Sequence, residues 1–193
     1  EEYVDVFGNT QGRIKWNYII NNIQYQPQSI SRDGTIYLTG GFINNYKLYA
    51  IKTSPYNDSK GLVLWETNTN NITYGGTAID KDGVVYLCNI IGVVYAINSD
   101  GTIKWSRTLQ NVKLTWVPTP AIGANGVLYI TIDDEGIDTG GNIIIDSYLV
   151  ALKRSNGSEL WRWKPSNKNT LNGIIRTTNI QGQWPMYGFD YTT

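Results

Sequence analysis

The chain has 193 residues, and its 16 basic and 16 acidic side chains cancel. It is long enough to bury a core as one domain. The charges are spread along the chain, which argues against binding to a nucleic-acid backbone or an anionic membrane. No apolar run approaches the roughly 20 residues of a membrane span, so no membrane insertion is expected. The sequence contains no His, which excludes Ser-His-Asp and Cys-His catalysis within the chain.

The composition favours β structure, because Tyr, Trp, Gly and Asn are abundant and long helix-forming stretches are missing. The first expected elements are two short strands at 3–6 and 13–16. Three sets of four strands should follow. They are expected at 28–30, 35–38, 48–51 and 61–65; at 77–79, 84–87, 94–97 and 101–105; and at 119–122, 127–130, 149–152 and 157–161.

An Asx-Gly pair precedes the second strand of each set: Asp33-Gly34, Asp82-Gly83 and Asn125-Gly126. Such pairs predict hairpin turns, because both residues tolerate a positive φ. Each set should therefore form one antiparallel sheet.

A glycine stands four residues before a tryptophan at four places: Gly12 and Trp16, Gly61 and Trp65, Gly101 and Trp105, and Gly157 and Trp161. The interval from Trp65 to Trp105 is about 40 residues, the usual length of a four-stranded propeller blade. Longer intervals are interpreted as loops at 53–60 and 133–142. The repeat predicts an all-β fold, a β-propeller of four-stranded antiparallel blades, as a single domain or propeller segment over 1–193.

About four blades are expected, with blade cores ending at the four repeated tryptophans. Residues 1–16 supply the last two strands of a blade, and 166–193 supply a partial blade whose first strand is 173–178. Three arrangements follow. The termini pair with each other, or they pair with another copy of the chain, or the sequence belongs to a larger ring of seven or eight blades.

These residues resemble the pyrroloquinoline-quinone-type repeat propellers, a group with quinoprotein alcohol dehydrogenases and BamB-like outer-membrane assembly lipoproteins. The shared pattern is S/T-P-A-I-x-x-D-G-x-x-Y, then L-Y-A-I/L, then G-x-x-x-W, over most of residues 1–161. The resemblance implies a docking motif in which the indole packs against the neighbouring blade. Its residues here are Ala50, Gly61 and Trp65; Ala96, Gly101 and Trp105; and Ala151, Gly157 and Trp161. The first unit departs from the pattern, with Asp5 in place of the alanine.

Enzymes of that group hold a quinone and Ca²⁺ beside a vicinal cysteine disulfide. This chain has one cysteine, Cys88, so a quinone cofactor is not expected. Cys88 lies in an apolar run and is predicted to be a buried hydrophobe. Calcium is the one metal considered, at Asp133, Asp134, Glu135 and Asp138, because Ca²⁺ prefers flexible acidic loops. A solvated acidic hairpin tip is the alternative, and Asp80-Lys81-Asp82-Gly83 is interpreted as a blade turn.

Other surface features suggest further ligands. Acceptor motifs for N-glycosylation begin at Asn57, Asn71 and Asn156. Aromatic residues outside the repeat cores are candidates for stacking on carbohydrate; they are Tyr18, Tyr25, Tyr56, Tyr74, Trp116, Trp163 and Tyr187.

The sequence therefore predicts a non-enzymatic scaffold that is secreted, periplasmic or on the cell surface and binds a protein or further copies of itself. One alternative is a structural subunit of a surface layer or filament joined through incomplete terminal blades. Another is a carbohydrate-binding module, or a polysaccharide-active enzyme that works with Asp133, Asp134 or Asp138 alone.

Overall fold

A computed structural model of the chain describes residues 2–4, 10–12, 16–20, 28–42, 44–57, 60–73, 75–109, 119–137 and 143–164. Within these ranges, the side chains of 2–4, 10–12, 133–137 and 143–146 are not described. The described part consists of strands, turns and loops, arranged as three four-stranded sheets and one short hairpin. None of its segments is a helix long and apolar enough to cross a membrane.

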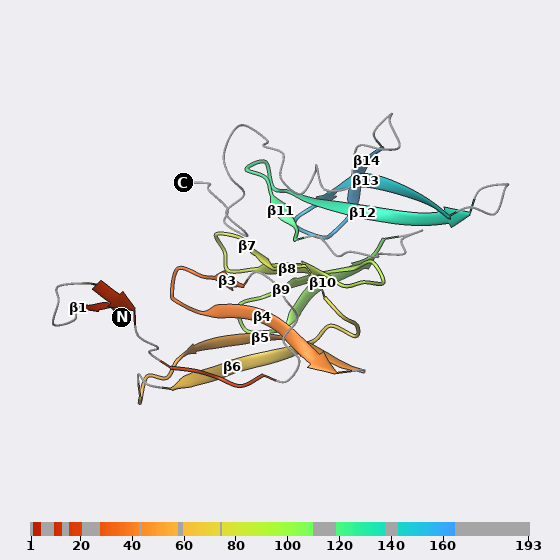
Figure 1. The fold of residues 1–193 in the computed structure, drawn as a ribbon. Coiled ribbons are helices and arrows are strands. Elements are labelled where there is room, and N and C mark those ends of the chain that lie inside the picture. Colours follow the sequence, from red (N-terminus) through yellow and green to blue (C-terminus); the bar gives the residue numbers. More distant parts are fainter. Residues whose placement is uncertain are drawn as a thin grey trace.

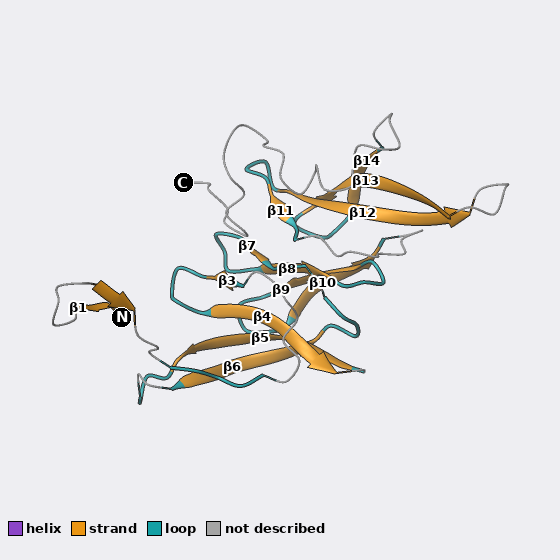
Figure 2. Cartoon of the chain, viewed as in Figure 1, coloured by secondary structure: helices purple, strands orange, loops and turns teal. Residues whose placement is uncertain are grey.

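Each four-stranded sheet uses consecutive strands in antiparallel order, as expected for a propeller blade (Figures 1 and 2). Blade 1 contains β3 (Ser29–Ile30), β4 (Ile36–Phe42), β5 (Asn45–Thr53) and β6 (Gly61–Asn68). Blade 2 contains β7 (Ala78–Ile79), β8 (Val85–Cys88), β9 (Val93–Ile97) and β10 (Ile103–Thr108). Blade 3 contains β11 (Ala121–Ile122), β12 (Val127–Ile137), β13 (Ile143–Lys153) and β14 (Glu159–Trp163). The three sets of four strands are confirmed.

The blades are stacked face to face in chain order, as an open row, with blade 2 between blades 1 and 3 (Figure 1). Apolar side chains at alternate strand positions fill the two interfaces, because successive residues of a strand point to opposite faces. One face of blade 2 packs on blade 1 through Val85, Leu87 and Ile97, all buried. Its other face packs on blade 3 through Tyr86 and Val94.

The Asx-Gly turns form in all three blades but differ in detail from the prediction. Gly34, Gly83 and Gly126 have φ values of 81°, 77° and 74°, whereas the Asp or Asn before each glycine has a negative φ. Backbone bonds such as Gly34 N to Ser31 O (3.0 Å) and Ser31 N to Thr35 O (2.9 Å) enclose a three-residue loop. This geometry is a type I turn followed by a glycine bulge, which needs only one left-handed residue.

The predicted loop at 133–142 is wrong over its first half, residues 133–137, which belong to a strand. Strands β12 and β13 continue through it, pairing Asp133 with Ser147 and Asp134 with Asp146, up to Ile137 with Ile143. The run Ile143-Ile144-Ile145 explains the extension, because β-branched residues favour strands. Residues 138–142, including Asp138, lie outside the described part.

The first predicted strand pair is also wrong where it is described. Strand β1 (Glu2–Val4) pairs with β2 (Thr10–Gly12), with Tyr3 opposite Gln11, and residues 5–9 and 13–15 lie outside the described part. The departure accompanies Asp5, which stands where the other units have the alanine that faces the tryptophan. The predicted partial blade at 166–193 lies outside the described residues.

Candidate functional site: the joints between blades

A row of three side chains crosses every blade in the same register. The alanine of the third strand lies between a tyrosine of the second strand and the repeated tryptophan of the fourth. The rows are Tyr37–Ala50–Trp65, Tyr86–Ala96–Trp105 and Tyr129–Ala151–Trp161. Because alanine is small, the two rings meet above it, with centroids 5.7, 6.1 and 5.9 Å apart in the three blades.

The register beside each tryptophan contains a bulge. Shifts occur between Ala50 and Ile51, between Ile103 and Trp105, and between Ala151 and Leu152. A bulge leaves one residue unpaired and re-aims the side chains next to it. Its recurrence at the same place shows that the tryptophan has a fixed orientation in each blade.

The indoles of Trp16, Trp65 and Trp105 then each pack against a glycine of the following blade. A Cβ built on Gly61 would lie 2.7 Å from Cε3 of Trp16. The corresponding distance is 2.8 Å from Gly101 to Cδ2 of Trp65, and 2.7 Å from Gly157 to Cε3 of Trp105. Real Cβ atoms do not approach other atoms so closely, so only glycine leaves room for the ring. In this structure the glycine of one repeat thus receives the tryptophan of the repeat before it.

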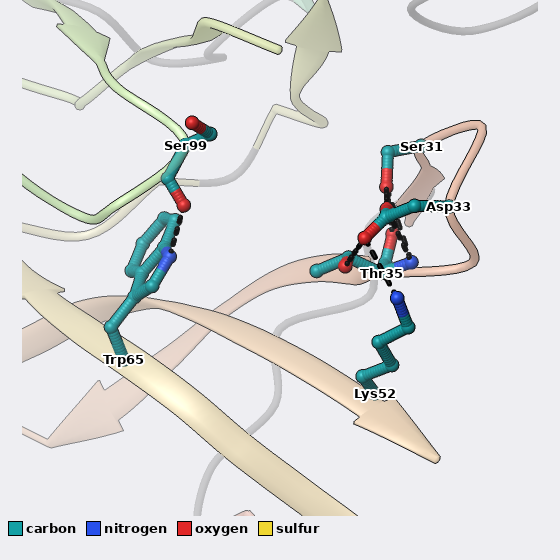
Figure 3. Close-up of polar contacts among 6 residues, drawn as sticks. All are labelled: Ser31, Asp33, Thr35, Lys52, Trp65 and Ser99. Atoms are coloured by element: carbon teal, nitrogen blue, oxygen red, sulfur yellow. Dashed lines mark hydrogen bonds and ion pairs between the residues drawn. The ribbon is translucent and has the colours of Figure 1, made fainter. Parts of the chain in front are cut away.

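The indole N–H groups also cross the joints. Trp16 Nε1 donates to Thr53 Oγ1 at 2.9 Å, and Trp65 Nε1 donates to the Ser99 carbonyl at 2.7 Å (Figure 3). Trp105 Nε1 donates to the Arg154 carbonyl at 3.0 Å. Every acceptor belongs to the connection, or the strand end, that precedes the fourth strand of the next blade. One short stretch of the next blade, its glycine and the connection or strand end before it, therefore both contacts the indole ring and accepts the hydrogen bond from the indole N–H.

Hydroxyl groups join neighbouring blades at, or just before, their first strands. Thr77 Oγ1 donates to Ser29 Oγ at 2.8 Å, between blades 2 and 1. Thr119 Oγ1 accepts a bond from the Gly76 backbone N–H at 2.8 Å, between blades 3 and 2. Ser29 and Thr77 are both buried, so these bonds satisfy polar groups that water does not reach. The joints of blade 2 with blades 1 and 3 are thus held both near the first strands and near the fourth strands of the sheets.

Blade 2 and blade 3 share one further contact, through a carboxylate that sequence reasoning assigned only to a turn. Asp80, whose side chain is 2% exposed, accepts bonds from the Asp82 and Val84 backbone N–H groups, both at 2.9 Å, and from the Tyr86 hydroxyl at 2.8 Å. Arg154 Nε of blade 3 lies 3.8 Å from Asp80 Oδ2. Burial and the bond to Asp80 raise the pKa of Tyr86.

The equivalent turn of blade 1 is open to solvent. Asp33 accepts from Lys52 Nζ at 2.8 Å and from Thr35 N and Oγ1 at 3.2 and 3.1 Å (Figure 3). The Lys52 ammonium and the Ser31 hydroxyl hold the pKa of Asp33 well below its usual range. The Asp33 side chain is 61% exposed, so we assign these bonds to turn geometry, with little net stabilisation.

Cys88 is buried, 1% exposed, as predicted. Burial raises the pKa of its thiol to about 12, so the sulfur is unreactive at neutral pH. It lies inside the interface between blades 2 and 3 and has no cysteine neighbour in the sequence. That no quinone is bound stays a prediction from the sequence.

The remaining predicted ligands stay predictions. The backbone of Asp133, Asp134 and Glu135 lies in β12, while their side chains and all of Asp138 are outside the description, so the calcium site is not placed. Among the candidate aromatics, Tyr18, Tyr56 and Trp163 are exposed and come from three separate parts of the chain. Of the glycosylation motifs, the one at Asn156 lies exposed at the tip between β13 and β14, whereas Thr73 of the Asn71 motif is buried.

Sequence reasoning missed two parts of the joint: the second-strand tyrosines and the acceptors of the indole N–H groups. The tyrosine had a signal, since it follows each turn glycine by three residues: Tyr37, Tyr86 and Tyr129. The acceptors had none, because Ser99 and Arg154 use backbone carbonyls and Thr53 uses a side chain.

The fold and its joints define a β-propeller segment built from four-stranded, tryptophan-joined blades. No family model matches the chain, and no curated protein matches its sequence. Among solved structures it is similar to the quinohemoprotein alcohol dehydrogenase of Comamonas testosteroni, with a TM-score of 0.55 and 18% identity over 75% of this chain. BamB from Moraxella catarrhalis matches with a TM-score of 0.47 and 12% identity over 77% of this chain.

The chain spans 21% of the dehydrogenase and 64% of BamB. The likeness to the dehydrogenase shows the fold, and the predicted propeller architecture is confirmed at that level. It does not transfer an activity, because one fold supports many unrelated functions.

Proposed function

We propose that this chain is a non-enzymatic propeller module that binds protein and acts as an assembly scaffold outside the cytoplasm. The observation that carries the proposal is the side of blade 3 that faces away from blade 2. It bears the same aromatic row as the covered sides of blades 1 and 2, yet Trp161 is 45% exposed. Tyrosine and tryptophan in such a patch are the residues most enriched in protein interfaces.

The exposed residues on the edge strand of blade 3 favour a protein ligand over a small molecule. Strand β14 is the last strand of its sheet, and beside Trp161 it exposes Leu160 at 50% and Trp163 at 52%. An edge strand with exposed apolar residues binds another polypeptide by strand addition or by face-to-face packing. A row of flat rings on a sheet offers contact area, whereas a small-molecule site is usually concave.

The buried polar groups of the described part serve the fold, which supports a non-enzymatic role. Asp80 is bound within its turn and near Arg154. Asn89 donates to the Thr69 carbonyl at 3.0 Å and accepts from the Val93 N–H at 2.9 Å. Catalytic groups instead tend to be directed into a cleft with a pKa matched to the reaction. A location outside the cytoplasm is supported by the exposed Asn156 acceptor motif.

Site-specific photo-cross-linking in the source organism tests this proposal. A benzoylphenylalanine in place of Trp163 should form a protein adduct, and the adduct should disappear when Trp161→Ala is added. The same probe in place of Leu62, which is 41% exposed on the outer strand of blade 1, is the matched control and should give no adduct. A probe at 163 that yields no protein adduct, or an adduct indifferent to Trp161, contradicts the proposed function.

A further inference from the structure

Among the described residues no blade covers the side of blade 3 that faces away from blade 2, and this side repeats a surface that is buried in blades 1 and 2. Two parallel rows form it, which we call the blade-3 outer face: Tyr129, Ala151 and Trp161, and Thr131, Leu149 and Trp163. The equivalent second row of blade 1 is Thr39, Leu48 and Thr67, exposed by 3%, 0% and 9%. In blade 3, Thr131 and Leu149 are half-buried and Trp163 is 52% exposed.

Trp161 has the docking contacts that its own blade supplies, and no described residue supplies those that a following blade gives to the other tryptophans. Its ring lies 5.9 Å from that of Tyr129, centroid to centroid, above Ala151. Within the described part of the chain no acceptor binds its indole N–H, whereas Trp16, Trp65 and Trp105 each have one. Tyr129 is half-buried, while the equivalent Tyr86 is 0% exposed.

The three occupied joints define what should cover this face. The occupant is a blade whose fourth strand begins with a glycine, preceded by an oxygen acceptor, and whose third strand carries apolar residues at alternate positions. Gly61, Gly101 and Gly157 already receive the indoles of the preceding repeats. Gly12 is the remaining glycine of the repeat, and Val4 and Val6 stand where blade 1 has Tyr49 and Ile51.

The N-terminal hairpin of the same chain does not lie on this face. Strands β1 and β2 lie beside blade 1, and blade 3 lies at the other end of the row (Figure 1). The segment that complements Trp161 is therefore available from another molecule.

We propose that the blade-3 outer face binds the N-terminal segment, residues 3–16, of a second copy of this chain, with Trp161 packed on Gly12. The inference rests on the proposed function and names the partner of the same surface. The contact is heterologous, because the two surfaces that meet are different. Copies joined in this way close into a ring or extend as a filament, depending on the rotation at each joint.

Light scattering on the purified chain tests the inference. The mass of the unmodified chain should rise with concentration beyond that of one molecule. Trp161→Ala removes the ring and Gly12→Val fills its seat, so each variant alone should remain a monomer. Tyr56→Ala, which removes an aromatic that is 95% exposed and distant in sequence from both surfaces, should assemble like the parent.

Mixing the two monomeric variants gives the decisive result. The Trp161→Ala chain keeps an intact Gly12 and the Gly12→Val chain keeps an intact Trp161, so one productive joint remains possible. We expect a complex of two chains, with no larger species. If the mixture stays monomeric, or if the parent is monomeric at every concentration, the inference is overturned. Should Gly12→Val fail to fold, as judged by circular dichroism, Val4→Asp takes its place.

The two proposals fail in different ways. An adduct between position 163 and another protein in the source organism, together with a parent chain that never self-associates, retains the scaffold function and overturns the second copy as partner. An adduct between two copies supports both.

Discussion

At the scale of single residues, the tryptophan of each repeat has two sets of partners. One set belongs to its own blade and the other to the next, and Trp105 has both. Its ring meets Tyr86, it lies on Gly157, and its N–H is bound to the Arg154 carbonyl. Among the described residues, Trp161 has only the first set.

This difference gives a prediction for stability. Trp105→Ala should lower the free energy of unfolding by about 3–5 kcal/mol, as for other large truncations in a core. Trp161→Ala should cost under about 2 kcal/mol, because much of its ring is already in water. Denaturant unfolding of the dilute, unassociated chain measures both. Equal losses of unfolding free energy at the two positions would show that contacts with the next blade do not stabilise the fold.

Buried tyrosines give a prediction for pH. Burial raises the pKa of Tyr37, Tyr86 and Tyr95, and the bond to Asp80 raises that of Tyr86 further. A folded-state pKa above the unfolded value favours the protonated form in the fold, so its stabilising effect is complete below the ordinary tyrosine pKa of about 10 and is lost as pH rises beyond it.

Chemical denaturation at several pH values between neutral and alkaline measures the effect. The parent should lose stability above that pKa, and Tyr86→Phe should lose less of it, although it starts from a lower value because Asp80 loses a donor. Identical pH profiles for the two proteins would contradict the assignment.

At the scale of elements, three glycines allow the cost of a left-handed backbone to be separated from the cost of displacing an indole ring. Gly126 has a φ of 74° and nothing within 4 Å of a built Cβ. Gly101 has a φ of 88° and lies against Trp65, and Gly61 lies against Trp16 without a positive φ. The chain thus contains one glycine with a positive φ only, one with an indole contact only, and one with both.

Alanine substitution at the three glycines should follow this division. Gly126→Ala should cost about 1–2 kcal/mol, for the left-handed backbone alone. Gly61→Ala should cost about 1–3 kcal/mol, for the displaced ring alone. Gly101→Ala should cost about the sum of the two. Thermal or denaturant unfolding measures the loss of stability in each variant. A loss for Gly101→Ala no larger than that for Gly126→Ala would show that the Trp65 indole does not pack on Gly101.

Much of these elements could be predicted, because their signals are local. The Asx-Gly pairs and the alternation of apolar residues fix the hairpins of blades 1 to 3. The prediction failed at 133–137, where three acidic residues were interpreted as loop although isoleucines across the hairpin pair with that segment. Strand pairing of this kind depends on the partner and not on the segment itself.

At the scale of the whole molecule, repetition predicted the succession of blades before the structure, whereas the docking of the indole on a neighbouring blade was implied by the family resemblance. The sequence pairs each glycine with the tryptophan four residues later, yet in space the glycine receives the tryptophan of the previous repeat. Sequence spacing describes one blade, and the joint lies between two. For the same reason nothing in the local pattern distinguished Trp161 from Trp65 or Trp105.

Hydrogen exchange of the indole N–H groups, resolved by nuclear magnetic resonance, tests the joints and the uncovered face together. In dilute solution the Nε1 protons of Trp65 and Trp105 should exchange slowly, because each is bound to a carbonyl of the next blade, while that of Trp161 exchanges fast. As concentration rises and copies associate, the Trp161 proton should become protected. Fast exchange at Trp65 and Trp105, or a Trp161 proton equally protected at every concentration, would contradict the account.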